Sequence, residues 1–71
     1  MKALTKRLRI LRAAANITQR DVAAKVGIPL QRFWEIENGY RVPTESEKAR
    51  IAKALRVDVS SAFDDETAVA S

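Results

Sequence analysis

The sequence predicts an all-α fold with four helices and a short fifth helical turn. Apolar residues recur every three or four positions along most of the chain, which is the spacing of one face of an α-helix. Signals that start and stop helices separate these stretches, and no segment alternates apolar and polar residues as a half-buried strand does. The 71 residues hold one small core, which excludes a second domain.

The first expected helix covers about residues 3–15 and has one apolar face. Leu4, Leu8 and Leu11 follow the i, i+4, i+7 spacing of that face, while lysines and arginines fill the other sides. Asn16 is expected to end the helix. The first element is therefore a basic amphipathic helix.

Two shorter helices are expected next, separated by a turn at Gly27. Thr18 is a favourable N-cap for the first of them, and the glycine can take the positive φ that ends it. Pro29 suits the first turn of the following helix, roughly residues 29–38, because its missing amide proton would have no partner there. Gly39 is expected to close that helix.

The fourth helix is expected to begin at a capping box, in which Thr44 and Glu47 satisfy each other's backbone amides. A short fifth turn or helix follows it. The tail, residues 64–71, is acidic and rich in small residues, so we expect a folded domain over 1–63 and a frayed end. The residues of the fourth helix expected to face inward are Ala49, Ile51, Ala52 and Leu55.

The composition excludes most enzyme chemistry. The chain has no cysteine and no histidine, so it offers no disulfide, thiolate ligand, imidazole ligand or neutral-pH base. It also has no phosphate-binding loop, and we expect no catalytic residue, metal or cofactor. No apolar run is long enough to cross a bilayer or to act as a signal peptide, so we expect a cytoplasmic, nucleoid-associated protein.

Positive charge is concentrated in the first part of the chain. Residues 1–43 contain nine Lys or Arg against three acidic residues, a net charge of +6, whereas residues 44–71 have a net charge of −2. A basic surface of this kind is expected to face a polyanion. The alternative is that the charge serves solubility alone.

The spacing of five residues indicates a helix-turn-helix motif. Counting from Gln19 as the first position, Ala23 is the fifth, Gly27 the ninth, Phe33 the fifteenth and Ile36 the eighteenth. A small residue is needed where the two helices cross, and glycine is needed at the turn between them. The two larger apolar residues anchor the second helix of the motif on the core. That helix is expected to enter the major groove of DNA.

Three short segments resemble the Xre, or Cro/cI, family of phage and bacterial repressors. The segments are Thr18-Gln19-x-x-Val22-Ala23, Gly27-Ile28 and Ile36-Glu37-Asn38-Gly39-x-Arg41-x-Pro43. The resemblance runs from about Leu4 to Phe63. It implies a compact five-helix bundle of the lambda-repressor-like type, with the helix-turn-helix formed by helices 2 and 3.

The resemblance also implies which residues read DNA bases. Leu30, Gln31 and Glu35 align with positions that face base edges in the family. A glutamine can make a bidentate contact to adenine, a glutamate can accept from the cytosine amino group, and a leucine can cover a thymine methyl. Gln31 is otherwise a solvated polar residue, and Glu35 otherwise pairs with Arg32 or excludes wrong bases.

Trp34 is expected beside the inward face of the third helix, because Phe33 and Ile36 already supply that face. One interpretation is packing against the second helix or the following loop. The other is a contact with a thymine methyl or a sugar, or an exposed anchor for a protein partner. We count Trp34 among the base-contacting residues.

Further residues are expected to contact the DNA backbone or to support the motif. Backbone contacts fix the position of a protein on DNA without reading its sequence. Arg12 and Glu37 align with a family ion pair that ties the first helix to the third, the alternative being that the arginine reaches DNA. The residues expected at the DNA backbone are Gln19, Arg32, Asn38, Tyr40 and Arg41.

The chain departs from the family pattern at three places. Pro29 stands where relatives have a Ser or Thr N-cap, so Ile28 is expected to serve as the cap. Glu45 and Lys48 replace apolar residues of the fourth helix, and the lysine stem is expected to lie along the core. Arg56 replaces a frequent glycine, so the fourth helix is expected to end on a residue other than glycine.

Together these features predict a transcriptional regulator, most simply a repressor, that binds double-stranded DNA as a homodimer. Its operator is expected to be nearly palindromic, with half-sites on the order of 34 Å apart. Val57, Val59 and Phe63 form the expected dimer surface. The alternative function is a helix-turn-helix module that binds a polymerase, a toxin or another regulator through Leu30 and Trp34.

Overall fold

The computed structural model describes the backbone of residues 2–63 and the side chains of residues 7–63. These residues form five helices and no strand: α1 (Lys2–Ala15), α2 (Gln19–Val26), α3 (Leu30–Glu37), α4 (Glu45–Leu55) and α5 (Val59–Phe63). The predicted all-α class is therefore confirmed. The expectations for the Leu4 side chain and for the tail, residues 64–71, lie outside the described residues.

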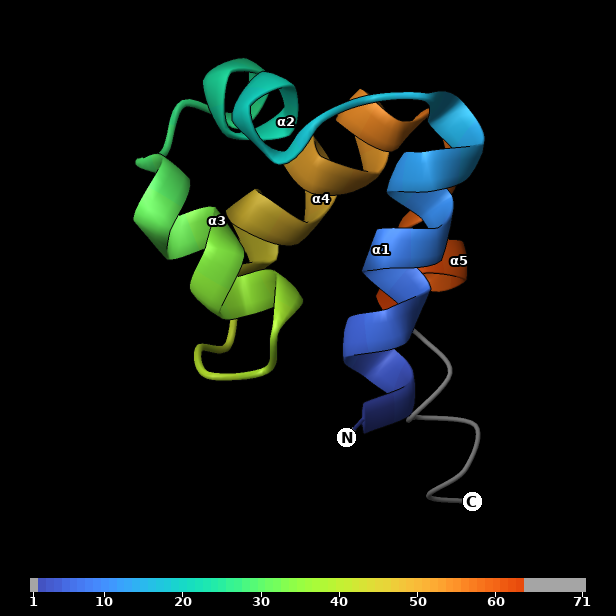
Figure 1. Ribbon diagram of the computed structural model, residues 1–71, viewed down its shortest axis with the longest axis horizontal. Helices are drawn as coiled ribbons and strands as arrows, with labels where there is room; N and C mark the ends of the chain where they lie inside the picture. Colours follow the sequence, from blue (N-terminus) through green and yellow to red (C-terminus); the bar gives the residue numbers. More distant parts are fainter. Residues whose placement is uncertain (1, 64–71) are drawn as a thin grey trace.

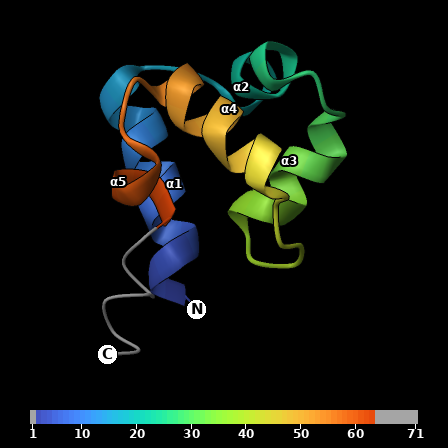
Figure 2. The same ribbon diagram turned by 180° about the vertical axis from the view of Figure 1, so that it is seen from behind.

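Helix α4 lies in the middle of the molecule. Helices α2 and α3 lie on one side of it, and α1 and α5 lie together on the other, as both views show (Figures 1 and 2). The connection between α2 and α3 is short, whereas a longer loop leads from α3 back to α4 (Figure 1). This arrangement leaves α3 at one edge of the molecule.

The expected cap and turn of α2 are both present. Thr18 accepts a hydrogen bond from the amide of Asp21 at 3.0 Å, and the Asp21 side chain accepts one from the Thr18 amide, which completes a capping box. Gly27 ends the helix in the left-handed region with φ 85°, and its amide donates to the Ala23 carbonyl. The buried Ala23 allows the close approach of the neighbouring helices that its small size predicts.

The expectation that Ile28 caps α3 is wrong. Pro29 is the N-cap, with extended backbone at φ −62° and ψ 148°, and the helix begins at Leu30. A proline is already fixed at this φ and has no amide proton to satisfy, so it can enter the helix without a capping side chain. The helix ends at Glu37, and Gly39 beyond it has the predicted positive φ.

The capping box of α4 is present, but the expectation that Ala49 faces inward is wrong. Thr44 and Glu47 form both hydrogen bonds of the box. Lys48 is half-buried while Ala49 is exposed, because the buried stripe follows positions 48, 51, 52 and 55. The Lys48 ammonium lies 6.0 Å from the centre of the Phe63 ring, so its stem covers the core as expected.

The core draws on all five helices. Phe33 and Ile51 are completely buried, and residues of α1, α2 and α5 close around them. Phe63 is 5% exposed and belongs to this core, so its expected place on a dimer surface is wrong. A ring at the end of a short last helix is buried here because the small domain needs its apolar area. The buried apolar residues are Leu8, Val22, Ala23, Val26, Phe33, Ile36, Ile51, Ala52, Leu55, Ala62 and Phe63.

Candidate nucleic-acid interface

The first turns of α3 stand outward from the domain. Leu30 is 38% exposed and Trp34, one turn later, is 41% exposed, while Phe33 is fully buried on the opposite side. Together with Gln31 and with Gln19 of α2, these two exposed residues line a shallow hollow of about 490 Å³. Three of the four residues expected at base edges therefore share one surface with a residue expected at a phosphate. We call these four residues the α3 surface.

A buried ion pair fixes α3 to α1. The Arg12 Nε donates to the Glu37 Oε2 at 2.8 Å, and Glu37 is only 1% exposed. A second guanidinium nitrogen donates to the Ile17 carbonyl at 3.1 Å. The structure thus contains the ion pair that the family resemblance implies, and it commits Arg12 to the protein interior instead of to DNA.

Gln19 joins the same network from α2. Its side-chain amide nitrogen donates to the second oxygen of Glu37, so the glutamate links three helices. One amide proton and the carbonyl oxygen of Gln19 remain for another partner, and the residue also lines the hollow beside α3. The network holds this side chain in place at the start of α2, where a phosphate contact is expected.

A polar network also holds the exposed side chains later in α3. Glu35 accepts from Gln31 Nε2 at 3.2 Å and from Arg41 Nε at 3.0 Å. These two contacts, led by the hydrogen bond from Gln31, lower the pKa of Glu35 below its ordinary value. The network brings two residues expected at bases next to one expected at the DNA backbone, and it orients all three before any ligand binds.

Arg32 is already paired within the protein. Its guanidinium makes a bidentate ion pair with Glu47, with Nε to Oε2 at 2.6 Å and a second nitrogen to Oε1 at 2.7 Å. The hydrogen bond from Arg32 lowers the pKa of Glu47 to about 2, and the same bond raises the pKa of Arg32. Because Glu47 also caps α4, this pair ties α3 to α4 and leaves Arg32 less free for DNA than expected.

Trp34 and Tyr40 stack on each other across the end of α3. Their ring centres are 5.6 Å apart, with an angle of 16° between the planes. Asn38 supports the turn between them, because its side chain donates to the Trp34 carbonyl at 2.9 Å. The stack joins a residue expected at bases to one expected at the backbone, and Val42, two residues after Tyr40 in the chain, is also exposed.

Two features of this interface were not predicted from the sequence. The stack joins positions six apart across a helix end, which is not a helical spacing. Arg20 is exposed in the first turn of α2 and makes no ion pair within residues 7–63. Its position next to Gln19 in the motif was the one available signal.

No described helix is long and apolar enough to span a membrane. Among the described residues, no group of three or more His, Cys, Asp or Glu is placed to hold a metal ion. What the described residues do present is a short helix, a glycine turn and a second helix whose first turns face outward. This arrangement defines the class of small helix-turn-helix proteins.

The comparison with protein families agrees with the geometry. The family model described as a helix-turn-helix domain matches residues 3–62, and the chain belongs to that family. Members of this class use the motif to bind DNA. No curated protein and no solved structure matches the chain closely enough to count as a relative.

Proposed function

We propose that the chain is a sequence-specific regulator of transcription of the Xre, or Cro/cI, type that binds double-stranded DNA with α3 in the major groove. One observation carries this assignment: the first turns of α3 are exposed, and Gln31 and Leu30 project there beside Gln19. In a helix-turn-helix protein, the first residues of the second helix of the motif reach the base edges. Gln31 is suited to adenine, and Leu30 to a thymine methyl.

The supporting contacts to DNA come from the residues around this surface. Gln19 and Arg41 offer hydrogen-bond donors at the start of α2 and after α3, and Arg20 adds an exposed cation. Asn38 and Tyr40 lie in the same loop region as Arg41. Such contacts set the register of a protein on the duplex, and α3 then selects the sequence. Repression follows if the operator overlaps a promoter, and the place of action is the nucleoid in the cytoplasm.

A homodimer suits this function because one domain covers only one half-site. Of the three residues expected at the dimer surface, Val59 is 41% exposed, whereas Phe63 is in the core and Val57 lines a separate hollow. Ile10 of α1 is also exposed, one turn after Arg7, which donates to the Ser61 carbonyl of α5 at 2.5 Å. We therefore assign the dimer contact to Val59 and Ile10.

Selection of bound sequences from a pool of random duplexes tests this function. The expected winners are near-palindromes whose half-sites lie about one helical turn, on the order of 34 Å, apart. Binding to the winners should persist at physiological salt, while binding to unrelated duplexes falls steeply as salt rises. A pool that is never enriched above the starting sequences would exclude sequence-specific recognition. Winners without symmetry would exclude the dimer alone.

The alternative function, a protein-interaction module, has one observation in its favour. Leu30, Trp34, Tyr40 and Val42 are all large, apolar and exposed, and the two rings stack. Exposed apolar side chains of this kind can anchor a protein partner. Under this alternative, duplex DNA shows little affinity at physiological salt, which separates the two functions in the same titration.

A further inference from the structure

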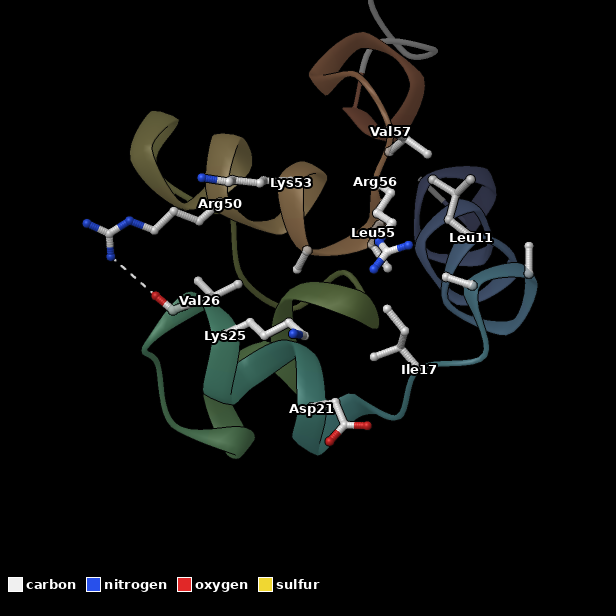
Figure 3. A pocket seen from close by; sticks show the side chains of 13 residues that line it. Leu11, Ile17, Asp21, Lys25, Val26, Arg50, Lys53, Leu55, Arg56 and Val57 are labelled. Carbon is white, nitrogen blue, oxygen red and sulfur yellow. Dashed lines mark hydrogen bonds between the residues drawn. The ribbon is translucent and has the colours of Figure 1, made fainter.

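A larger hollow opens away from the α3 surface. It lies between the C-terminal ends of α1 and α4 and one side of α2 (Figure 3), and its volume is about 970 Å³. No residue of α3 lines it. Its floor is apolar. It is formed by partly buried side chains that pack against the core: Leu11, Ile17, Ala54 and Val57.

The rim of this hollow is positively charged. Lys25, Lys53, Arg50 and Arg56 line the hollow, and Asp21 is the one acidic residue among its lining (Figure 3). Arg50 donates to the Val26 carbonyl at 3.2 Å. The other three cations make no ion pair within residues 7–63. An apolar floor below unpaired cations attracts a ligand that has both an apolar part and a negative charge.

Arg56 is held at this rim in an unfavourable backbone conformation. It is the C-cap of α4 and lies in the left-handed region, with φ 62° and ψ 41°. Glycine takes this conformation without steric cost, and Asn also tolerates it, whereas a long side chain is strained there. The fold alone therefore favours glycine at position 56. Arg56 therefore places an unpaired charge beside the cavity at a position where glycine would be less strained.

We propose that the hollow binds a small organic anion with an apolar body. The apolar part would lie on the floor formed by Leu11, Ile17 and Val57, and the anionic group would meet Lys53 and Arg56 at the rim. The volume lies within the range of about 300–1,000 Å³ in which proteins bind small molecules. The opposite charge of the rim selects an anion over a neutral molecule of the same shape, and the site does not depend on DNA binding.

The test uses 1-anilinonaphthalene-8-sulfonate as the probe, because it combines a naphthalene and a phenyl group with one sulfonate. Its affinity for the full chain is measured by calorimetry without DNA, and the contacted amides are located by two-dimensional NMR. The amides of Ile17, Lys25, Ala54 and Val57 should shift, while those of the α3 surface should not. N-phenyl-1-naphthylamine, which has the same rings and no sulfonate, should bind about fivefold more weakly or worse, as expected for the loss of one solvent-exposed charge contact.

Substitutions at the rim separate binding from folding. Arg56→Gly removes a cation and also relieves the backbone, so the affinity for the probe should fall by about fivefold while the Tm rises by a few degrees. Lys53→Gln should lower the affinity by a similar factor without changing the Tm. Arg20→Gln is the matched control, because it removes one exposed cation from α2 outside the hollow, and it should leave the affinity unchanged.

Several outcomes would overturn the assignment. Equal binding of the neutral compound, or wild-type affinity in both rim variants, would show that the hollow does not select an anion. Amide shifts confined to the region of Trp34 and Tyr40 would place the probe elsewhere. Shifts at the hollow that grow with protein concentration alone would assign it to a second copy of the chain. Displacement of the probe by a short duplex, or by a peptide of alternating Glu and Leu, would assign it to DNA or to a protein partner.

Discussion

The surroundings of the α3 surface and the rim of the larger hollow use positive charge in different ways. Around α3, Arg12, Arg32 and Arg41 each pair with a carboxylate of the chain. At the hollow, Lys53 and Arg56 have no such partner within residues 7–63. The net charge of +6 on residues 1–43 therefore overstates the free positive charge next to α3.

The paired side chains around α3 are preorganised, whereas the unpaired cations at the hollow attract anions. Side chains held by internal hydrogen bonds lose less conformational entropy when they bind, which favours a specific geometry. Unpaired cations on long side chains attract anions over a distance but fix no geometry. The comparison predicts that substitutions around α3 change stability and sequence choice, whereas loss of the Lys53 charge at the rim of the hollow leaves both nearly unchanged.

The largest expected effect comes from the buried ion pair. Glu37→Gln leaves the guanidinium of Arg12 largely buried without its counter-charge, so the free energy of unfolding should fall by about 3–5 kcal/mol. Urea denaturation followed by circular dichroism measures this loss. Glu45→Gln is the control, because the Glu45 side chain is 91% exposed, and the change there should stay within about 0.5 kcal/mol. Equal midpoints for the two variants would mean that the pair does not hold α3.

The second effect concerns sequence choice. Gln31→Ala should weaken binding to the selected operator by roughly 1–3 kcal/mol and leave binding to unrelated duplexes nearly intact, because only a base contact is lost. Binding titrations with both duplexes measure the two affinities. If affinity fell equally on all sequences, Gln31 would contact the backbone, and the network with Glu35 would serve to position it there.

The third effect is a pH dependence of stability. The pKa of Glu47 is about 2 in the fold and ordinarily 4.5, so the unfolded chain takes up the proton first as pH falls. The stabilisation by the Arg32 pair is therefore complete above about pH 4.5 and is lost as pH falls towards 2. At pH 7, Glu47→Gln should lower the urea midpoint by roughly 0.5 M, and this difference should vanish near pH 2. A difference that stays constant with pH would contradict the assignment.

The smallest effect is on the salt dependence of DNA binding. Arg41→Ala should weaken all duplexes alike and reduce the slope of log affinity against log salt by about one unit, since one phosphate contact is lost. Lys53→Gln removes a cation from the rim of the hollow and should leave the slope unchanged. If Lys53→Gln flattened the slope and Arg41→Ala did not, the rim of the hollow would contact the DNA phosphates and Arg41 would not.

Much of the fold could be predicted because its signals are local. The capping residues Thr18 and Thr44, together with Gly27, mark helix ends through interactions within four residues. Two local predictions were wrong. Pro29 itself caps α3, because extended backbone suits proline, and Ala49 is exposed, because the buried stripe passes through Lys48 instead.

The candidate site could be predicted only in part, because its partners are distant in the sequence. The exposed positions of α3 follow from helical spacing, once Phe33 is placed in the core. The pairing of Arg32 with Glu47 spans 15 residues and depends on how α3 and α4 pack, so no local pattern indicates it. Phe63 was expected at a dimer surface but lies in the core, because the sequence does not show which apolar residues a small core buries.

The stack of Trp34 on Tyr40 has a practical consequence. Trp34 is the single tryptophan of the chain, and it lies on the α3 surface instead of in the core. Its intrinsic emission therefore reports on the environment of that surface and can follow engagement by a ligand in unlabelled protein.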